Sequence, residues 1–240
     1  MKLDLSKIPT SRNDLKKGLI LPEELTSDVT YLAGFIAGDG NLFVKKGEKY
    51  DLNLTGNFSD EKKFFDIVLV KLFQKIFSIN VKAEFKGKNS YGIRIFSKGL
   101  LFFFNKIFEI PVGKKSEKIF IPKIVLASDK LTRAFIQGFA DADFSLCLKK
   151  RYREVAYYPV ITGASKSEKI ISQISEYLNK NKIPYSLQLN YTHLDRRFNK
   201  FRIINKIHIY GGKNVYKWMT KIGFKNQKFV KIAKESILEM

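Results

Sequence analysis

Two aspartates stand at matching places in two similar stretches of the chain. Asp39 falls in "YLAGFIAGDGNLFVKK" (residues 31–46) and Asp143 in "FIQGFADADFSLCLKK" (residues 135–150). Each stretch reads as an apolar helix that closes on the acid and passes into an alternating strand. A carboxylate is disfavoured at the negative end of a helix, and two neighbouring carboxylates resist ionisation. A divalent cation would offset both costs, and carboxylate oxygens favour Mg²⁺.

Mg²⁺ in proteins usually binds a few carboxylates together with a phosphate, and the charge of the chain supplies a reason to expect phosphate. Lys and Arg number 44 against 23 Asp and Glu, which gives a formal net charge of +21. So large an excess predicts a polyanionic partner, most often nucleic acid. Metal-assisted hydrolysis of a phosphodiester follows, in which metal ions activate a water and stabilise the leaving oxygen.

A third acid, Asp141, is an alternative ligand close to Asp143. It aligns with Ala37 rather than with an acid, so the repeat favours Asp39 and Asp143. The residues just before the two acids, Gly38 and Ala142, complete the expected metal site.

Other classes of protein are excluded by residue counts. Cys147 is the only cysteine, so neither a disulfide nor a Cys-rich zinc site is expected. Two histidines, His193 and His208, cannot build a His-rich metal site. The sequence has no apolar run of about 20 residues and no apolar leader at its start. We therefore expect a soluble intracellular protein in a reducing compartment.

The elements that must position the acids recur in the same order in both halves, which indicates an internal duplication. We expect residues 1–27 to be an N-terminal extension, 28–125 the first repeat with its linker, and 126–240 the second repeat. Thr26, Ser27 or Asp28 should cap the first helix, and Ser59 or Asp60 the second. In the first repeat the expected helices cover residues 28–39, about 59–77 and 97–108, and the expected strands cover 41–46, 50–57, 81–86 and 91–96.

Small residues lie four apart in each acid-ending helix, so that they share one helix face. They are Gly34 and Gly38 in the first helix, and Gly138 and Ala142 in the second. Glycine inside a helix costs about 1 kcal/mol relative to alanine, and the usual reason for it is close approach of another backbone. We predict that the two helices pack together through these four residues and end side by side. The fold class is then α+β, with two αββαββα repeats.

"LAGFIAGDG" (residues 32–40) and "IQGFADADF" (residues 136–144) resemble the two motifs of a single-chain LAGLIDADG homing endonuclease. The second copy departs from the signature at Gln137 and Phe144. The αββαββα order of each half also fits this family, so the resemblance covers nearly all of residues 28–240.

The resemblance implies a pseudodimeric monomer that makes double-strand breaks in DNA at a long, asymmetric site, as an intron-encoded Mg²⁺-dependent hydrolase. Mn²⁺ or Ca²⁺ can also occupy such a site. It further implies that Asp39 and Asp143 hold the metal, and that saddle-shaped antiparallel sheets lie along the DNA. A basic pocket around the scissile phosphates corresponds to Lys115 and Lys225, with Lys118 and Lys228 as the next choices.

Strand alternation predicts which side chains face the DNA. The face that follows the acids contains Asn41, Phe43 and Lys45 in the first repeat, and Ser145, Cys147, Lys149, Arg151 and Arg153 in the second. The polar faces of the other strands contribute Asn53, Thr55, Lys82, Arg94, Gln188, Lys206 and His208. Arg196 and Arg197 fall in a basic hairpin, "THLDRRFNKFR", which we expect to be a phosphate clamp.

Two alternatives remain open. Some members of this family are maturases that bind intron RNA and assist splicing, and net charge does not separate DNA from RNA. The chain could also be a DNA-binding regulator with an inactive site. Retention of both acids favours an active nuclease.

Overall fold

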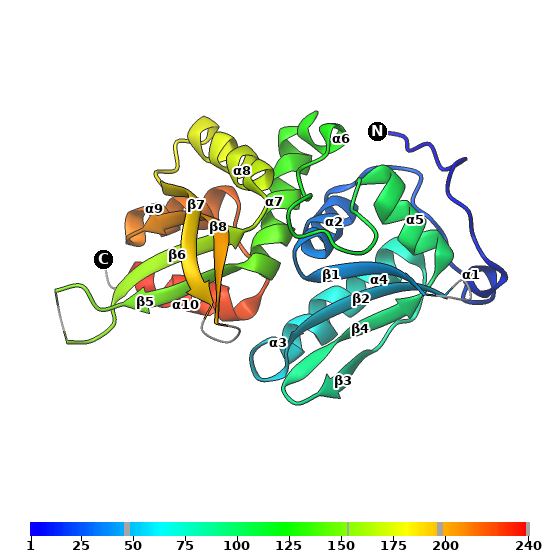
Figure 1. The fold of residues 1–240 in the computed structure, drawn as a ribbon, viewed down its shortest axis with the longest axis horizontal. Helices are drawn as coiled ribbons and strands as arrows, with labels where there is room; N and C mark the ends of the chain where they lie inside the picture. The colour runs from blue at the N-terminus through cyan, green and yellow to red at the C-terminus, as the bar shows by residue number, and fades with distance from the viewer. Residues whose placement is uncertain (46–48, 153, 196–198, 239–240) are drawn as a thin grey trace. The chain divides into compact units, whose positions relative to one another are not determined.

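The computed structural model describes residues 1–45, 49–152, 154–195 and 199–238, and it confirms the expected α+β class with two pseudo-repeats. The chain divides into two compact units, one formed by residues 1–115 and 122–142 and the other by residues 116–121 and 143–240. Each unit contains one four-stranded antiparallel sheet (Figure 1). The repeats expected from the sequence are a division of the chain by similarity, whereas these units are a division by packing.

The first unit begins with a short helix, α1 (Arg12–Lys16). Its sheet has the strand order β1-β2-β4-β3. The further elements, in chain order, are α2 (Ser27–Asp39), β1 (Gly40–Lys45), β2 (Lys49–Asn57), α3 (Phe58–Phe64), the π-helix η1 (Phe65–Leu69), α4 (Val70–Phe77), β3 (Ala83–Gly87), β4 (Ser90–Phe96), α5 (Lys98–Ile107), α6 (Lys123–Leu126) and α7 (Asp129–Asp143).

The second unit repeats the same sheet topology, with the strand order β5-β6-β8-β7. Its last helix, α10, follows the αββαββα order as an addition. The elements are β5 (Phe144–Lys149), β6 (Tyr158–Ser165), α8 (Glu168–Lys180), β7 (Ser186–Asp195), β8 (Lys200–Tyr210), α9 (Gly212–Lys221) and α10 (Gln227–Leu238).

Helix capping agrees with the sequence at one helix and differs at the next. Thr26 caps α2, because its hydroxyl accepts a 3.3 Å hydrogen bond from the backbone N–H of Val29. The expectation of Ser59 or Asp60 as the second cap was wrong. Asn57 is the cap, and its side chain accepts from the N–H of Asp60 at 3.2 Å. The helix therefore starts directly where β2 ends, at the residue after Asn57.

The core of the first unit is mainly aromatic. The rings of Phe77, Phe103 and Phe104 are fully buried and contact one another with centroids 5.4–5.8 Å apart. Leu52 and Leu54 are buried beneath the sheet, as the alternation of β2 predicts. In the second unit the fully buried Trp218 stacks on Phe144 at 5.6 Å, which fixes the start of β5 against α9.

Helices α2 and α7 pack backbone to backbone within the first unit. A Cβ atom added to Gly34 would overlap the carbonyl oxygen of Phe135, and one added to Gly138 would overlap that of Tyr31. Only glycine allows so close an approach at these positions. The packing of the two motif helices is thus confirmed at Gly34 and Gly138. For Gly38 and Ala142 it stays a prediction.

Among the residues that the structure describes, no helix is long and apolar enough to cross a membrane.

Candidate functional site

Asp39 and Asp143 are each the last residue of a helix. Asp39 ends α2, and β1 starts at the next residue, Gly40, whose backbone is extended. Asp143 ends α7 in the same way, and Phe144 begins β5. Both acids are half-buried. Neither helix has a basic residue in its last turn, so any cation that offsets the negative helix end must come from elsewhere in the chain.

At α2 that cation is Lys115. Its ammonium donates a 2.9 Å hydrogen bond to the carbonyl oxygen of Ile36, and it also donates to the carbonyls of Ala37 and Gly38. The carbonyls of Ala37 and Gly38 are acceptors of the kind that a helix leaves without partners at its C-terminal end, whereas that of Ile36 also accepts from the N–H of Gly40. Lys115 therefore neutralises the end of the helix that carries Asp39.

The segment before Lys115 is fixed against the sheet. The N–H of Gly113 donates a 2.7 Å hydrogen bond to the carbonyl of Leu42, and Val112 forms a parallel bridge with the same residue of β1. Gly113 has a φ of +83°, a conformation that favours glycine. The family resemblance implied a basic pocket at Lys115, but nothing in the sequence indicated that this lysine caps α2, because the contact joins residues far apart in the chain.

The other candidate lysines differ from Lys115 in their surroundings. Lys225 is half-buried between α9 and α10, and its catalytic role stays a prediction. Lys118 is exposed. Lys228 lies 4.9 Å from the ring centroid of Phe229, which is a packing contact.

Asp141 has a structural environment that differs from that of the two terminal acids. Its side chain is 1% exposed and accepts a 2.5 Å hydrogen bond from the hydroxyl of Tyr31. Burial, followed by the negative charge of Asp141, holds the pKa of Tyr31 well above its usual value. The carboxylate is thus engaged in the packing of α7 on α2.

The strands that leave the acids alternate as expected. Leu42 and Leu146 are buried, while the side chains of the opposite parity are exposed: Asn41, Phe43 and Lys45 on β1, and Ser145, Cys147 and Lys149 on β5. Arg151 is exposed just after β5, and Arg153 lies outside the described residues.

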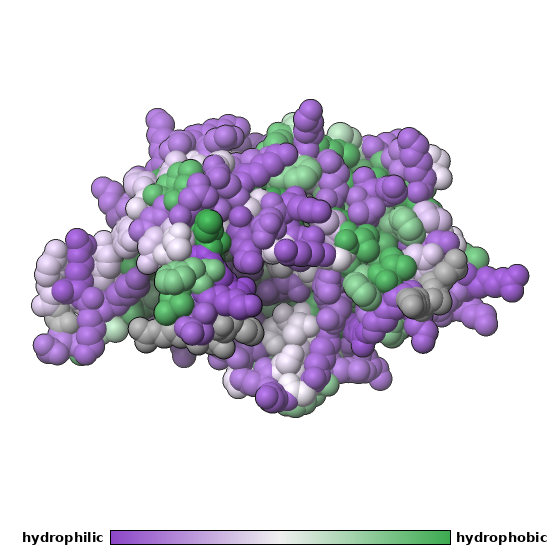
Figure 2. Space-filling view, in the orientation of Figure 1, coloured by the Kyte–Doolittle hydropathy of each residue, from purple (hydrophilic) through white to green (hydrophobic). Residues whose placement is uncertain are grey.

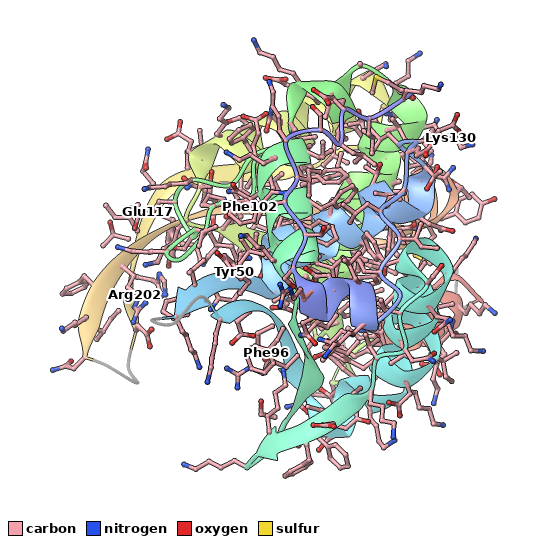
Figure 3. All side chains as sticks on the ribbon, turned by 90° about the vertical axis from the view of Figure 1, so that its right-hand side faces the viewer. Tyr50, Phe96, Phe102, Glu117, Lys130 and Arg202 are labelled. Atoms are coloured by element: carbon pink, nitrogen blue, oxygen red, sulfur yellow. The ribbon has the colours of Figure 1, made fainter. Side chains whose placement is uncertain are left out.

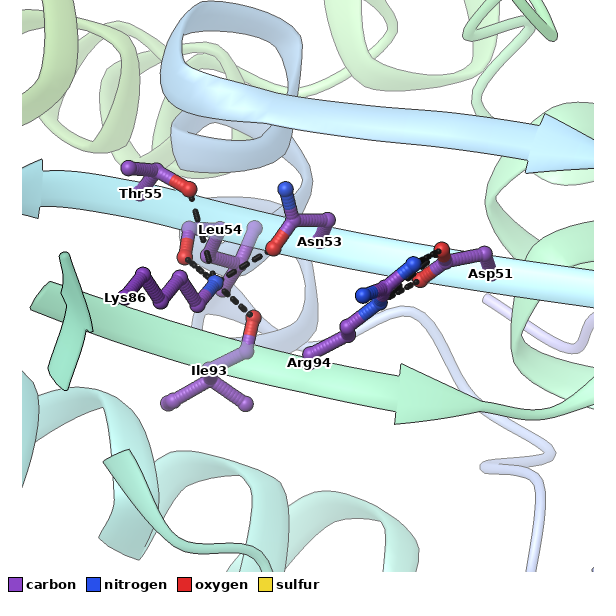
Figure 4. A network of polar contacts seen from close by, with 7 residues as sticks. All are labelled: Asp51, Asn53, Leu54, Thr55, Lys86, Ile93 and Arg94. Carbon is purple, nitrogen blue, oxygen red and sulfur yellow. Dashed lines mark hydrogen bonds and ion pairs between the residues drawn. The ribbon is translucent and has the colours of Figure 1, made fainter. Parts of the chain in front are cut away.

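The polar face of the first sheet carries a network of contacts (Figure 4). The guanidinium of Arg94 binds both carboxylate oxygens of Asp51, with the shortest contact at 2.5 Å. The ammonium of Lys86 donates to the side-chain oxygen of Asn53, to the carbonyls of Leu54 and Ile93 at 2.8 and 3.1 Å, and to Thr55 at 3.4 Å. Burial, with a smaller effect of Arg94, lowers the pKa of Lys86 to about 8.

This network includes three residues that the sequence singled out (Asn53, Thr55 and Arg94) and two that it missed. Strand alternation puts Asp51 on the same face as Asn53 and Thr55, and there it is only 4% exposed and paired with Arg94. Lys86 was read only as the end of a strand. Lys82 was assigned to a strand and is instead an exposed residue that precedes β3.

The second sheet has its own polar and aromatic face. The ammonium of Lys206 lies 4.1 Å from the ring centroid of Tyr191, and Gln188 is opposite Lys206 in the β7–β8 register. The ring Nδ1 of His208 and the hydroxyl of Thr162 are 3.0 Å apart. Burial and the nearby lysines, Lys149 and Lys206, lower the pKa of His208. Arg196 and Arg197 lie outside the described residues, although the hairpin they join is present as β7 and β8.

Each of the two helix ends offers one carboxylate, a ligand that suits Mg²⁺ better than a transition metal. Within the described ranges, no three or more His, Cys, Asp or Glu side chains are grouped so that they could hold a metal on their own. Mg²⁺ does not need such a group, because it keeps several waters and takes one or two carboxylates together with substrate phosphates. Asp39 and Asp143 provide oxygen ligands of this kind.

The surface agrees with a polyanionic partner. Hydrophilic side chains cover most of the face shown in Figure 2, with small hydrophobic patches between them. Since lysine and arginine outnumber acids by 44 to 23, much of this hydrophilic surface is basic.

Solved structures of known proteins share this architecture. No protein-family model and no curated protein sequence matches the chain. Solved structures do: a complex of I-DmoI with DNA and Ca²⁺ has a TM-score of 0.57 at 20% identity, over 89% of this chain and 97% of the other. The chain has the homing endonuclease fold.

Two further solved structures match the chain over most of its length. Mesophilic variants of the homing endonuclease I-DmoI have a TM-score of 0.53 at 20% identity, over 82% of this chain and 88% of theirs. The meganuclease I-SmaMI, bound to uncleavable DNA, has a TM-score of 0.52 at 12% identity, over 90% and 89%. At such identities the homing endonuclease fold is common to all three chains, while target and chemistry have to be argued from this chain's own residues.

Proposed function

We propose that this protein is a site-specific DNA endonuclease that makes double-strand breaks with the help of a divalent cation. The observation that carries the proposal is the position of Asp39 and Asp143, each at the end of a motif helix and each directly followed by a strand with an exposed polar face. The basic surface and the fold seen in proteins bound to DNA support it.

Asp39 and Asp143 would hold the cation, with Gly38 and Ala142 beside them. When bound, Mg²⁺ would lower the pKa of a water and stabilise the leaving oxygen of the phosphodiester. Lys115 has a defined role, because its ammonium is held by the backbone carbonyls of the residues just before Asp39. It holds a positive charge where a scissile phosphate would approach, and Lys225 is proposed for the same part in the second repeat.

Double-stranded DNA is the proposed partner, bound by a single protein chain. The exposed residues of β1 (Asn41, Phe43, Lys45) differ from those of β5 (Ser145, Cys147, Lys149), so the two repeats would read different half-sites. Arginine reads guanine, and asparagine or glutamine reads adenine, by paired hydrogen bonds, whereas lysines at the edges hold phosphates. We place the activity inside the cell, since the chain has one cysteine and needs DNA.

A selection from random DNA tests the proposal. The protein is incubated with a randomised duplex library and Mg²⁺, and the ends produced are sequenced. We expect one asymmetric site, cut on both strands, with no cutting when a chelator replaces Mg²⁺. Cleavage without sequence preference, or a preference for structured intron RNA in a parallel binding assay, would contradict the proposal.

The acids are tested on the selected site. Asp39→Asn and Asp143→Asn keep side-chain shape and remove one charge each, so duplex affinity without Mg²⁺ should hold or rise, because phosphate contacts dominate binding. Cleavage should collapse in both. The matched control is Asp60→Asn, an exposed acid in α3. Wild-type cutting by the Asp39→Asn, Asp143→Asn double variant would refute the mechanism.

A further inference from the structure

A cavity of about 600 Å³ lies where the N-terminal extension meets one end of the first sheet. Ser11 and Asn13 of the extension form one wall. The opposite wall comes from the start of β2, with Lys49 and Tyr50, and from the end of β4 and the start of α5, with Phe96, Ser97 and Lys98. Figure 3 shows Tyr50 and Phe96 close to the short N-terminal helix. No sequence motif pointed to this place.

The extension is held firmly, so the cavity is already formed. Asp14 is 1% exposed, and its Oδ2 accepts hydrogen bonds from the N–H of Gly99 at 3.0 Å and from the N–H of Ser11 at 2.8 Å. Lys17 donates a 2.7 Å hydrogen bond to the carbonyl of Phe96. Helix α1 is therefore fixed to the N-terminus of α5 and to the end of β4.

The cavity is basic with aromatic walls. The ammonium of Lys98 lies 5.2 Å from the ring centroid of Tyr50, and the guanidinium of Arg94 lies 4.9 Å from that of Phe96. Such contacts hold a cation in place without neutralising its charge. Of the two acids nearby, Asp51 is paired with Arg94, and Asp14 accepts backbone hydrogen bonds through Oδ2 and keeps its charge. Lys49 and Lys98 in the lining outnumber Asp14. The net field in the cavity therefore favours an anion.

An equivalent cavity of about 430 Å³ occurs in the second unit. It lies at the two corresponding strand ends, where β6 starts and β8 stops, and the end of β5 also lines it. It again combines cations with rings. Arg151 lies 4.6 Å from the ring centroid of Tyr158, and Lys149 pairs with Tyr158 in the strand register. The two repeats differ in almost every residue here, yet both keep a basic, aromatic cavity. Among the described residues, an added segment, α1, covers the first cavity, and the lining of the second includes no such segment.

The location of the first cavity suggests its occupant. Strand β1 leaves Asp39 and runs six residues to Lys45, which pairs with Lys49 at the cavity. At about 3.3 Å per residue this is roughly 20 Å from the acid. The cavity thus lies at the far end of the surface proposed to follow the DNA.

We propose that this α1-covered cavity binds a backbone phosphate of the DNA duplex outside the part that the sheet reads, so that the N-terminal extension lengthens the binding site on one side. Lys49 and Lys98 contribute the charge, and Asn13 contributes a neutral hydrogen-bond donor. The proposal rests on DNA as the partner, but it does not depend on cleavage.

The test uses a duplex selected from the random library by binding rather than by cutting, and it measures affinity for that duplex at a series of salt concentrations, without Mg²⁺. Each phosphate contact contributes about 0.9 to the magnitude of the slope of log affinity against log salt, so loss of this one phosphate in Lys49→Gln with Lys98→Gln should lower that magnitude by about one. Asn13→Lys should raise it by about one. The control pair is Lys63→Gln with Lys71→Gln, exposed lysines of α3 and α4 away from the cavity, and its slope should not change.

Hydroxyl-radical footprinting gives a second readout. The Lys49→Gln, Lys98→Gln variant should lose protection at one outer edge of the site, and cutting with Mg²⁺ should stay at the same bond. An unchanged slope and footprint in a protein that still cuts would overturn the cavity proposal and leave the nuclease intact. A changed slope and footprint in a protein that never cuts would support the cavity and refute the nuclease.

Discussion

The hydroxyl of Tyr31 on α2 donates a 2.5 Å hydrogen bond to Oδ2 of Asp141 on α7. Both residues are buried in the first unit, beside the glycine contacts of the two helices. The hydrogen bond between Tyr31 and Asp141 shows that the two aspartates at the end of α7 have different roles. Asp141 ties the helices together, whereas Asp143, two residues later, ends the helix half-exposed.

Tyr31→Phe should lower the free energy of unfolding by about 1–3 kcal/mol, because it removes one hydrogen bond from a buried carboxylate, that of Asp141. The pKa of Tyr31 is raised in the folded protein, so above pH about 10 the unfolded chain loses this proton first and stability falls as pH rises. In urea unfolding between pH 8 and 11, the stability difference between the wild type and Tyr31→Phe should therefore shrink above pH about 10. Tyr216→Phe, at a tyrosine that is 53% exposed, is the control. Equal alkaline profiles in all three proteins would contradict the assignment.

Gly138→Ala should destabilise the fold although alanine favours helices. The added Cβ would overlap the carbonyl oxygen of Tyr31, which is backbone and cannot rotate away, so a net loss of about 1–3 kcal/mol is expected. Gly99→Ala is the matched comparison, because its new Cβ would meet the flexible end of Leu19. Chemical unfolding of both variants measures the difference. A Gly138→Ala protein as stable as Gly99→Ala would argue against close packing of α2 on α7.

Lys115→Met should affect stability as well as cleavage. It removes the cation from the carbonyls at the end of α2, which should cost about 1–2 kcal/mol. It should also slow cutting, with little loss of duplex affinity, if the charge stabilises the transition state. Lys114→Met, at the exposed neighbour, should change neither property. A variant that cuts slowly but unfolds like the wild type would show that Lys115 acts on the phosphate alone and does not cap the helix.

Lys86 should give stability a distinct pH dependence. Its pKa is lowered to about 8 in the folded protein, so between pH about 8 and its ordinary value near 10.4 the unfolded chain holds the extra proton. Stability should therefore rise with pH across this window on account of Lys86. Lys86→Met should remove that rise, whereas Lys88→Met, at an exposed lysine nearby, should keep it. Parallel profiles for wild type and Lys86→Met would show that Lys86 keeps its ordinary pKa.

Local patterns in the sequence were enough for the helices that end at the acids and for the strand faces that follow them. Helix α2 ends at Asp39 as expected, and the alternation of β1 is the expected one. These features depend on residues within a few positions of one another. Periodicity and capping chemistry record such short-range relationships directly.

What the sequence did not reveal depends on contacts between distant residues. The burial of Asp51 follows from Arg94, 43 residues away, and the role of Lys115 follows from carbonyls 77 to 79 residues before it. Nothing local distinguishes Lys86 from the many other lysines. Likewise, Asp14 of the N-terminal extension accepts a hydrogen bond from Gly99, which is 85 residues away in the sequence. The extension, which lies outside the expected repeats, is therefore part of the first unit.

Helix α7 heads the second repeat in sequence but packs with the first unit, which ends at Ala142. This matters for hybrid proteins made by recombining halves of related chains. A crossover in the linker before α7 would set a foreign α7 against this chain's α2 and would have to recreate both glycine contacts and the Tyr31–Asp141 bond at once. A crossover after Ala142 inherits all three intact, and it transfers the second sheet as the exchangeable part.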